Sequence, residues 1–532
     1  MTEKTTIDLL WITLSAGLVF LMQAGFLCLE TGLTRSKNNI NVAIKNLADF
    51  GVSTLLYWAF GFALMFGATR GGWLGTTAFV PEFTSENIEL GVFFLFQVMF
   101  CGTAVTILSG AVAERLRFGG YIIITAVVAG LTFPIFGHWA WNGINFGQAT
   151  GWLAARGFVD FAGSSVVHSV GGWTSLAVLL VVGARNGRFP KDAPPQKIHG
   201  ANIPLAALGV LLLYVGWMGF NGGSTLAMND RVSGVIANTI LAGAAGMVTA
   251  LIIAGIRHRQ ADVDAVMNGS LAGLVAITAN AHVVGAGAAV VIGAIGGVVM
   301  MVATDLLERV QIDDAVGAIP VHLAAGIWGT LAVGIFGRPE LLGTSLSRSA
   351  QIGVQFLGVI VCFLWVFVVT YLLLRLIDRI SPLRVNAEAE HIGLNISEHG
   401  ATTELLDLFF VMDRQSKTGD FSLRVPVEPF TEVGQIAHRY NLVMDALEQA
   451  RNRTQAVIQT AMDGIITFSK ETLAITMLNP AAENIFGYPE LSITEQPISL
   501  IVRTKENEYE NKPTAVLHVL LDHAAAAEHP YE

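Results

Sequence analysis

The sequence predicts an all-α membrane protein of eleven transmembrane helices, arranged as a five-plus-five inverted repeat with one additional helix and followed by a cytoplasmic tail. Hydrophobic residues make up 53% of the 532 residues and charged residues only 14%, far from the balance of a soluble protein. The hydrophobic residues form runs near or above twenty residues between Ile7 and about Ile377, and such runs stop after Arg379. Runs of this length cross a lipid bilayer.

The apolar runs predict the number and positions of the transmembrane helices. About eleven of them are long enough to cross roughly 30 Å of hydrocarbon at about 1.5 Å per residue. Their centres lie near Val19, Thr54, Cys101, Val127, Ser175, Leu211, Gly243, Ile277, Gly293, Trp328 and Phe363. The chain opens with Met1-Thr-Glu-Lys rather than a basic stretch, and no small-residue cleavage motif precedes a polar sequence. We therefore expect the first run to be a retained helix rather than a signal peptide.

Charged loop residues indicate the orientation in a plasma (inner) membrane, because positive residues stay preferentially in the cytoplasm. Most positive loop residues fall on one face: Arg35, Lys37, Arg115, Arg117, Arg185, Arg188, Lys191, Lys197, Arg257, Arg259, Arg375, Arg379 and Arg384. We predict that the N-terminus is outside and the tail is cytoplasmic. The formal net charge of -10 and the lack of a cluster of Lys and Arg on any segment disfavour nucleic acid as a partner.

An internal repeat relates the two halves of the membrane part. The segments Asp160-Phe-Ala-Gly-Ser-Ser-Val-Val-His168 and Asp314-Ala-Val-Gly-Ala-Ile-Pro-Val-His322 both place an Asp eight residues before a His that follows Val. They fall at the fifth and tenth predicted spans. Halves with equal, odd numbers of spans insert with opposite topology, and transporters of this design bind their substrates near the membrane midplane.

The two histidines are the first candidate site residues. An ionisable side chain inside a membrane costs at least a few kcal/mol unless it faces a partner or a cavity. Neutral imidazole has one donor and one acceptor, so His168 and His322 can bond to each other and still present a nitrogen to a small polar molecule such as ammonia. The alternative is that each His only satisfies a backbone carbonyl. Asp160 and Asp314 are expected at the two mouths, capping helix N-termini rather than contacting a permeating species.

Other chemistries find little support. No Gly-x-Ser-x-Gly elbow accompanies the histidines, and no third residue has suitable spacing to complete a metal site. The three cysteines, Cys28, Cys101 and Cys362, lie inside apolar runs and are interpreted as core residues rather than disulfides or metal ligands. We expect no enzymatic activity, no metal and no cofactor.

With these segments in view, residues 1–395 resemble the ammonium transporter (Amt/Mep/Rh) family. The stretches that carry the resemblance are Gly25-Phe-Leu-Cys-Leu-Glu30-Thr-Gly, Phe96-Gln-Val-Met-Phe100, Ser109-Gly-Ala-Val-Ala-Glu114-Arg115, the Asp160 to His168 segment, Gly216-Trp-Met-Gly-Phe220-Asn221-Gly-Gly-Ser224 and Val321-His322. The resemblance implies a homotrimer with one pore in each subunit, in contact with ammonium or ammonia and the lipid bilayer.

The resemblance also supplies roles for single residues. Phe100 and Phe220 match an aromatic pair that closes the outer end of the pore. Ser224 matches a hydroxyl of an external ammonium recruitment site that includes Phe100, and an aromatic wall there would add cation–π attraction of roughly 1 to 2 kcal/mol. We choose Trp141 for that wall. Trp139 and Trp152 stay open as alternatives, and all three could instead belong to an interfacial aromatic belt.

The implied mechanism starts with recruitment of ammonium outside. Deprotonation near Phe100 and Phe220 follows, and ammonia then passes along His168 and His322. Potassium is excluded because it has no proton to shed and donates no hydrogen bonds.

The tail adds two expected modules. Residues 396–452 resemble a HAMP relay: a short helix at 403–412, an extended connector and a second helix whose apolar residues Val433, Ile436, Tyr440, Val443 and Leu447 form a coiled-coil seam. A simple trimerising coil is the alternative.

Residues 453–532 resemble the opening of a PAS sensor domain, carried by Ala461-Met-Asp-Gly-Ile-Ile-Thr-Phe-Ser and Leu478-Asn-Pro-Ala-Ala-Glu-Asn-Ile-Phe-Gly-Tyr488. The stretch is short for a complete PAS fold, and its end has no recognisable output motif. The sequence thus predicts an ammonium sensor that relays occupancy to a signalling module and a downstream effector, with pore residues that also allow conduction. The alternative is an ammonium transporter with a regulatory tail.

Overall fold

The computed structural model describes residues 4–143 and 148–501, and it confirms the all-α membrane fold. Two compact units are present, residues 1–402 and residues 403–532. Within the described residues of the first unit, ten helices are long and apolar enough to cross a membrane. An eleventh apolar helix, α10 (Val263–Thr278), is shorter than these. The exact number of spans stays a prediction.

The first half of the membrane unit contains five of these helical segments. They are α1 (Thr6–Leu33), α2 (Asn39–Leu56) continued by α3 (Phe62–Phe66), α4 (Ile88–Ala111), α5 (Phe118–Val127) continued by α6 (Phe133–Trp141), and α7 (Val170–Val182). A short antiparallel pair, β1 (Thr69–Arg70) and β2 (Leu74–Gly75), lies between α3 and α4.

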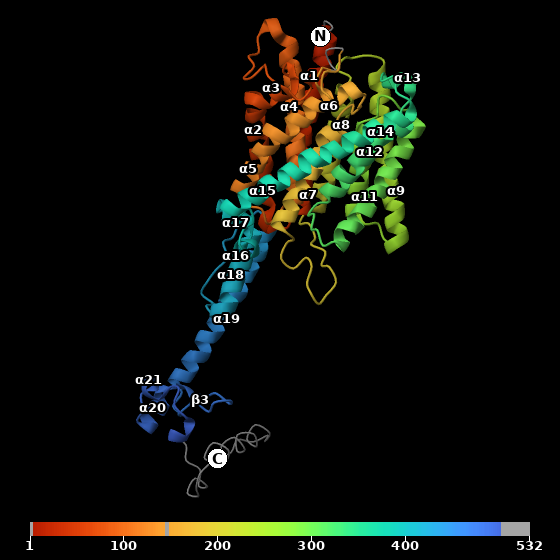
Figure 1. The fold of residues 1–532 in the computed structure, drawn as a ribbon. Helices are drawn as coiled ribbons and strands as arrows, with labels where there is room; N and C mark the ends of the chain where they lie inside the picture. Colours follow the sequence, from red (N-terminus) through yellow and green to blue (C-terminus); the bar gives the residue numbers. More distant parts are fainter. Residues whose placement is uncertain (1–3, 144–147, 502–532) are drawn as a thin grey trace. The chain divides into compact units, whose positions relative to one another are not determined.

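The second half follows with α8 (Ile203–Gly223), α9 (Arg231–His258), α10, α11 (Ala286–Arg309) and α12 (Ala325–Phe336). The short α13 (Pro339–Leu342) leads to α14 (Arg348–Cys362) and α15 (Val369–Ile380). Figure 1 shows α14 and α15 as one long helix that runs obliquely across α12 and α7, against which they pack. Two short helices, α16 (Ala387–Ile392) and α17 (Leu394–His399), end the unit.

The halves meet along α1 and α8, the first helix of each half. Glycine allows this close approach, as is common between membrane helices. A Cβ atom added at Gly209 of α8 would stand 2.4 Å from the backbone nitrogen of Leu29, and one added at Gly25 would stand 2.8 Å from the side chain of Leu213. Any larger residue at these two positions would force the halves apart.

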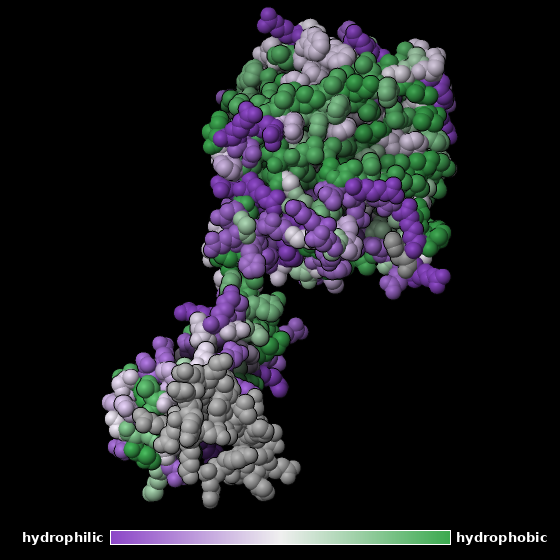
Figure 2. All heavy atoms as spheres, turned by 60° about the horizontal axis from the view of Figure 1, so that its bottom comes forward, coloured by the Kyte–Doolittle hydropathy of each residue, from purple (hydrophilic) through white to green (hydrophobic). Residues whose placement is uncertain are grey.

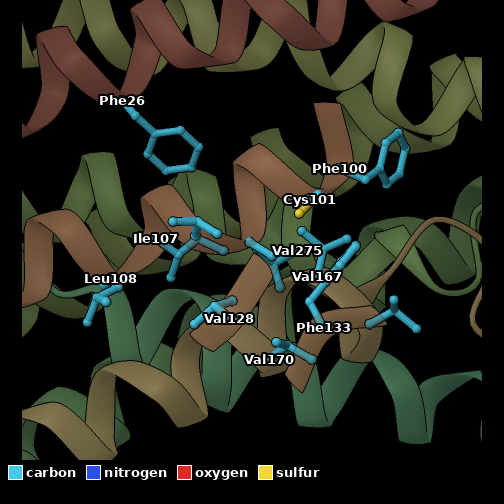
Figure 3. Close-up of a cluster of buried hydrophobic side chains, with 14 of the residues drawn as sticks. Phe26, Phe100, Cys101, Ile107, Leu108, Val128, Phe133, Val167, Val170 and Val275 are labelled. Carbon is cyan, nitrogen blue, oxygen red and sulfur yellow. The ribbon is translucent and has the colours of Figure 1, made fainter. Parts of the chain in front are cut away.

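Hydrophobic side chains cover the flank of the membrane unit, and hydrophilic side chains gather at its ends (Figure 2). This distribution suits a protein whose flank contacts lipid. Inside, the main core joins residues of nearly every helix of the unit. In the close-up of part of it, apolar side chains of α1, α4, α7 and α10, including Phe26, Ile107, Val170 and Val275, point toward one another (Figure 3).

Five wide π-helical turns occur within or at the start of the long helices in the described residues. They are η2 (Tyr57–Gly61), η4 (Val128–Thr132), η7 (Ser164–Ser169), η8 (Ile319–Ala324) and η9 (Phe363–Val368). Such turns are rare and often mark functional positions. Two of them, η7 and η8, contain His168 and His322.

The second unit begins with two helices, α18 (Glu404–Thr418) and α19 (Glu432–Thr460). They pack around Leu408, Val425 and Ala437, and Val433 and Tyr440 of the predicted seam contact this cluster. The other seam residues, Ile436, Val443 and Leu447, are exposed in the single chain. This leaves one face of α19 apolar and uncovered within the described residues.

A small α+β segment follows α19. Strands β3 (Ile466–Phe468) and β4 (Ile475–Leu478) pair in antiparallel fashion, and α20 (Pro480–Phe486) and α21 (Glu490–Ile493) follow them. Asn479 caps α20 by accepting the N–H of Ala482, and its amide donates to the carbonyls of Ile458 and Asp463. The end of the predicted PAS-like segment, after residue 501, lies outside the described residues.

Candidate functional site

His168 and His322 meet inside the membrane unit. Their Nδ1 atoms lie 3.1 Å apart and the ring centroids 5.2 Å apart. Both side chains are buried. Because one nitrogen must donate while the other accepts, each neutral ring keeps its Nε2 atom for another partner. The Nε2 atom of His168 is buried and has no hydrogen-bond partner among the described residues.

Asp160 and Asp314 organise the turns that carry the histidines. Asp160 accepts the backbone N–H groups of Gly163, Ser165 and Val166 at 2.8 to 3.1 Å. These contacts satisfy the backbone N–H groups at the start of η7. Gly163 has φ +108°, a left-handed conformation that only glycine adopts without strain.

The second half repeats this arrangement. Asp314 accepts the N–H groups of Val316, Gly317 and Ile319 at 2.6 to 3.3 Å, and Gly317 has φ +81°. The eight-residue spacing from Asp to His therefore has a structural cause in both halves. With this spacing, the carboxylate of the Asp accepts backbone N–H groups of the first helical turn, and the His side chain projects from the following turn.

The aromatic pair lies next to the histidines. The rings of Phe100 (α4) and Phe220 (α8) are stacked with centroids 4.1 Å apart, and both are buried. Phe220 lies 5.5 Å from His168, so the aromatic stack and the histidine pair form one continuous row. Trp217, which sequence reasoning missed, stacks on His168 at 5.2 Å. It stands three residues before Phe220, a spacing that puts both on one face of α8.

A cavity of about 420 Å³ lies on one side of the aromatic pair, lined by Phe100, Trp141, Asp160, Ser224 and His282 among others. Ser224 donates to the carbonyl of Phe220 at 2.8 Å, which leaves its oxygen lone pairs for an incoming donor. Burial raises the pKa of Asp160 to about 6, although hydrogen bonds from backbone amides oppose this rise. The site therefore combines aromatic faces, a hydroxyl oxygen and a carboxylate.

The three tryptophans occupy different places. Trp141 lines the cavity, its ring lies 6.1 Å from that of Phe100, and its Nε1 donates to the carbonyl of Asp160. Trp139 donates to the carbonyl of Trp73, and Trp152 packs on both Trp73 and Trp139. Neither Trp139 nor Trp152 lines the cavity. Part of the segment between Asn142 and Thr150, residues 144–147, lies outside the described residues.

His282 is a further cavity residue that the sequence did not reveal. It lies between α10 and α11, where its ring stacks on Phe161 at 4.1 Å. Burial, together with the charge of Arg231, lowers the pKa of His282 to about 3. Its imidazole is therefore neutral near pH 7, and its Nδ1 atom has no partner among the described residues.

On the other side of the histidine pair is a small cavity of about 10 Å³, lined by Phe26, Glu30, Ile107 and His322 among others. Beyond it, Arg185 binds Asp313 through both carboxylate oxygens. Burial opposes the ionisation of Asp313, but the hydrogen bonds from Arg185 and the charges of Arg115 and Arg185 outweigh burial and lower its pKa. Within the part of the chain that the structure describes, no group of His, Cys, Asp and Glu is arranged to hold a metal ion.

This chain is similar to known proteins in sequence and in structure. Residues 10–404 match the model of the Ammonium Transporter Family, and residues 452–519 match that of a PAS domain. The protein named "Putative ammonium transporter sll0537" from Synechocystis is 55% identical over 85% of this chain and 84% of its own length. Ammonium transporter Amt2 of Archaeoglobus fulgidus is 40% identical over 74% of this chain and 87% of its own length.

Two solved structures show the same fold. A structure called "Sensor Amt Protein" is 41% identical, covers 74% of this chain and 98% of its own, and superimposes with a TM-score of 0.71. Mep2 of Saccharomyces cerevisiae is 28% identical over 73% of this chain and 89% of its own, with a TM-score of 0.65.

Proposed function

Because this chain belongs to the ammonium transporter family, we propose that its membrane domain binds ammonium in the cavity beside Phe100 and that the tail relays this occupancy to a cytoplasmic effector. The observation that carries the binding proposal is the continuous row of rings from Phe100 through Phe220 to His168 and His322. A single chain presents all of these groups, whether or not it assembles into the homotrimer that we expect.

The cavity residues have distinct roles in this proposal. The ring of Trp141 and the face of Phe100 attract the cation, and Ser224 accepts one of its hydrogen bonds. The buried Phe100 and Phe220 rings exclude water, so the ion gives its proton to water in the outer cavity before ammonia enters. In this proposal the proton crosses the membrane separately from ammonia, so that transport carries charge. Ammonia, which both donates and accepts hydrogen bonds, then passes along the two imidazoles. We place the cavity outside and the positively charged loops in the cytoplasm.

The sensor role is supported by the tail. A PAS domain match at residues 452–519 begins within the last part of α19, which packs with α18, and one structural relative carries the word "Sensor" in its name. Ammonium can drive such a relay only if it binds two conformations of the chain with different affinities. The HAMP-like interpretation of residues 396–452 gives the relay a physical form, a change in the packing of α18 against α19.

A spin-label measurement tests the relay. The exposed Ile436 of α19 is replaced by a labelled cysteine, Ile436→Cys, in a background with Cys28→Ser, because Cys28 is the native cysteine that is not fully buried. Distances between labels in the assembled full chain are measured in liposomes with and without ammonium. A shift that disappears in the recruitment variant Ser224→Ala supports sensing.

The alternative, an ammonium transporter with a regulatory tail, is favoured by the intact row of pore residues. It predicts an ammonium-dependent current on solid-supported membranes with label distances that ignore ammonium. A chain that neither binds ammonium nor carries such a current would contradict both functions.

A further inference from the structure

Glu30 places a carboxyl group beside the proposed pore. It lies near the end of α1, is 2% exposed, and lines the same small cavity as His322. Phe26, one turn earlier on α1, packs at 6.0 Å from the His322 ring. An acid therefore stands on the inner side of the histidine pair, where the mechanism described above uses none.

All the described hydrogen-bond partners of this carboxyl group are neutral. Its Oε2 atom accepts from the amide of Asn46 at 2.9 Å and from the hydroxyl of Ser109. Among the described residues, Glu30 takes part in no ion pair. Burying a carboxylate without a cationic partner costs several kcal/mol. The site is therefore favourable only if a cation or a proton joins it.

The buried cation near Glu30 is Lys45 of α2, which acts on the carboxyl group through its charge but forms no ion pair with it among the described residues. Asp49 and Lys45, on successive turns of α2, share Tyr121: its hydroxyl donates to Asp49, and the Lys45 ammonium lies 5.7 Å from its ring. Lys45 also donates to the carbonyl of Leu116. One buried lysine thus accompanies two buried acids, and the acid that faces the cavity is Glu30.

We propose that Glu30 and His322 hold a second ammonium ion, as the intact cation, on the inner side of the histidine pair. The cavity of about 10 Å³ has room for about one water-sized molecule. If His322 donates its Nδ1–H to His168, its Nε2 accepts an N–H of the ion, and the carboxylate of Glu30 accepts another. The ring of Phe26 forms an apolar wall that favours a cation.

This inference rests on the proposed function, because ammonia reaches the site through the pore and takes up a proton there from the inner side. An inner ammonium site explains why an acid, rather than another apolar residue, lines a passage for neutral ammonia. Once ammonia has taken up a proton, the negative charge of Glu30 binds the resulting ammonium ion. The alternative is that Glu30 remains protonated and binds no ammonium ion.

The test is a calorimetric titration of the purified full chain with ammonium chloride. A density map alone would not identify the ion, since ammonium and water have the same number of electrons. We expect two sites in each chain, reduced to one by Glu30→Gln, which keeps the size and the hydrogen-bonding oxygen of the side chain. Asp49→Asn, a buried acid that does not line the cavity, is the matched control and keeps both sites.

The outcomes separate the two proposals. One site in the natural chain that is lost in Ser224→Ala and unaffected by Glu30→Gln overturns the inner site and leaves the proposed function intact. No binding at all overturns both. If Glu30→Gln loses both sites through misfolding, infrared difference spectroscopy of the natural chain decides: ammonium must increase the signal of an ionised carboxyl group or displace that of a protonated one. An unchanged carboxyl signal contradicts the inner site.

Discussion

Phe220 connects the two parts of the candidate site, since its ring stacks on Phe100 and also lies beside His168. Such a ring blocks water as long as it stays in place. Phe220→Ala should therefore increase the proton leak of liposomes that contain the protein but no ammonium. A pH-sensitive dye inside the liposomes measures this leak.

Phe133→Ala is the control for that variant, because Phe133 is equally buried but its ring packs on Tyr57 and, among the described residues, contacts neither the ring of Phe100 nor a histidine ring. Both substitutions remove a buried aromatic ring and should cost about 3 to 5 kcal/mol of folding stability. Only Phe220→Ala should leak. Equal leaks would show that lost packing, rather than an opened gate, is the cause.

Asp160 gives the cavity a pH dependence. Its pKa of about 6 lies above the ordinary value of 3.8, so the folded chain keeps this proton over a range where the unfolded chain has released it. Raising the pH through about 4 to 6 therefore lowers the stability that this group contributes. Below about pH 6 the cavity also loses a negative charge. Ammonium affinity, measured by calorimetry, should fall as the pH drops from about 7 to about 5.

Asp160→Asn should remove that pH dependence while keeping one oxygen to cap η7. His282 does not confuse the measurement, because its pKa of about 3 keeps it neutral throughout this range. A variant whose affinity follows the same pH curve as the natural chain would exclude Asp160 as the titrating group.

Single residues also show how far sequence reasoning extends. The repeated spacing predicted His168 and His322, and the resemblance to the family predicted Phe100 and Phe220. Glu30 and His282 could not be located in this way, since the direction in which a helix or loop turns its side chains depends on packing. For the same reason, the sequence left Trp139 and Trp152 open as alternatives to Trp141.

The membrane helices contain π-helical turns that hydropathy does not predict. Hydropathy shows where a helix crosses the membrane, but it does not distinguish an α turn from the π turns at η2, η4, η7, η8 and η9. A π turn adds one residue to a turn without changing its composition. The Asp-to-His spacing is explained by the hydrogen bonds that Asp160 and Asp314 accept at the start of η7 and η8, but it does not by itself predict a π turn.

The loops that we predict to be cytoplasmic are held by a buried ion pair. Arg185 is 4% exposed and Asp313 is 3% exposed. Removing one partner of such a pair leaves an uncompensated buried charge and typically costs about 3 to 5 kcal/mol. We expect Arg185→Ala to lower the Tm of the purified chain clearly.

Arg257→Ala is the matched control, because the Arg257–Asp305 pair links α9 and α11 at the surface. Exposed pairs contribute about 0 to 1 kcal/mol. Its Tm should therefore stay close to that of the natural chain. A similar decrease in Tm in both variants would show that the buried pair stabilises the chain no more than the exposed pair does.

The molecule as a whole divides after Thr402. The composition of the sequence already separated a part with long apolar runs from a tail without them. The matches confirm the ammonium transporter family for residues 10–404 and a PAS domain for residues 452–519. The three-part division at residues 395 and 452 stays a prediction, as do the trimer and the HAMP-like relay. The spacing of apolar residues predicted the seam on α19, and Ile436, Val443 and Leu447 of this seam are exposed in the single chain. The spacing does not say which helix covers them.

Removing residues 403–532 tests the independence of the membrane unit. The truncated chain should fold, because its core contains no residue of the tail. We expect its ammonium affinity to stay within a few-fold of that of the full chain, since coupling between sites usually amounts to about 1 to 3 kcal/mol at most. Loss of binding on truncation would show that the tail forms part of the site.

The histidine pair is the feature on which the whole account depends, and an ammonium current on solid-supported membranes tests it most directly. His168→Ala removes one of the two imidazoles whose Nδ1 atoms lie 3.1 Å apart. The control, His138→Ala, removes a buried histidine that bonds to the carbonyl of Met65 and lines neither the row nor the outer cavity. The account predicts that His168→Ala abolishes the current and keeps ammonium binding at the outer cavity, whereas His138→Ala keeps both. An undiminished current in His168→Ala would contradict it.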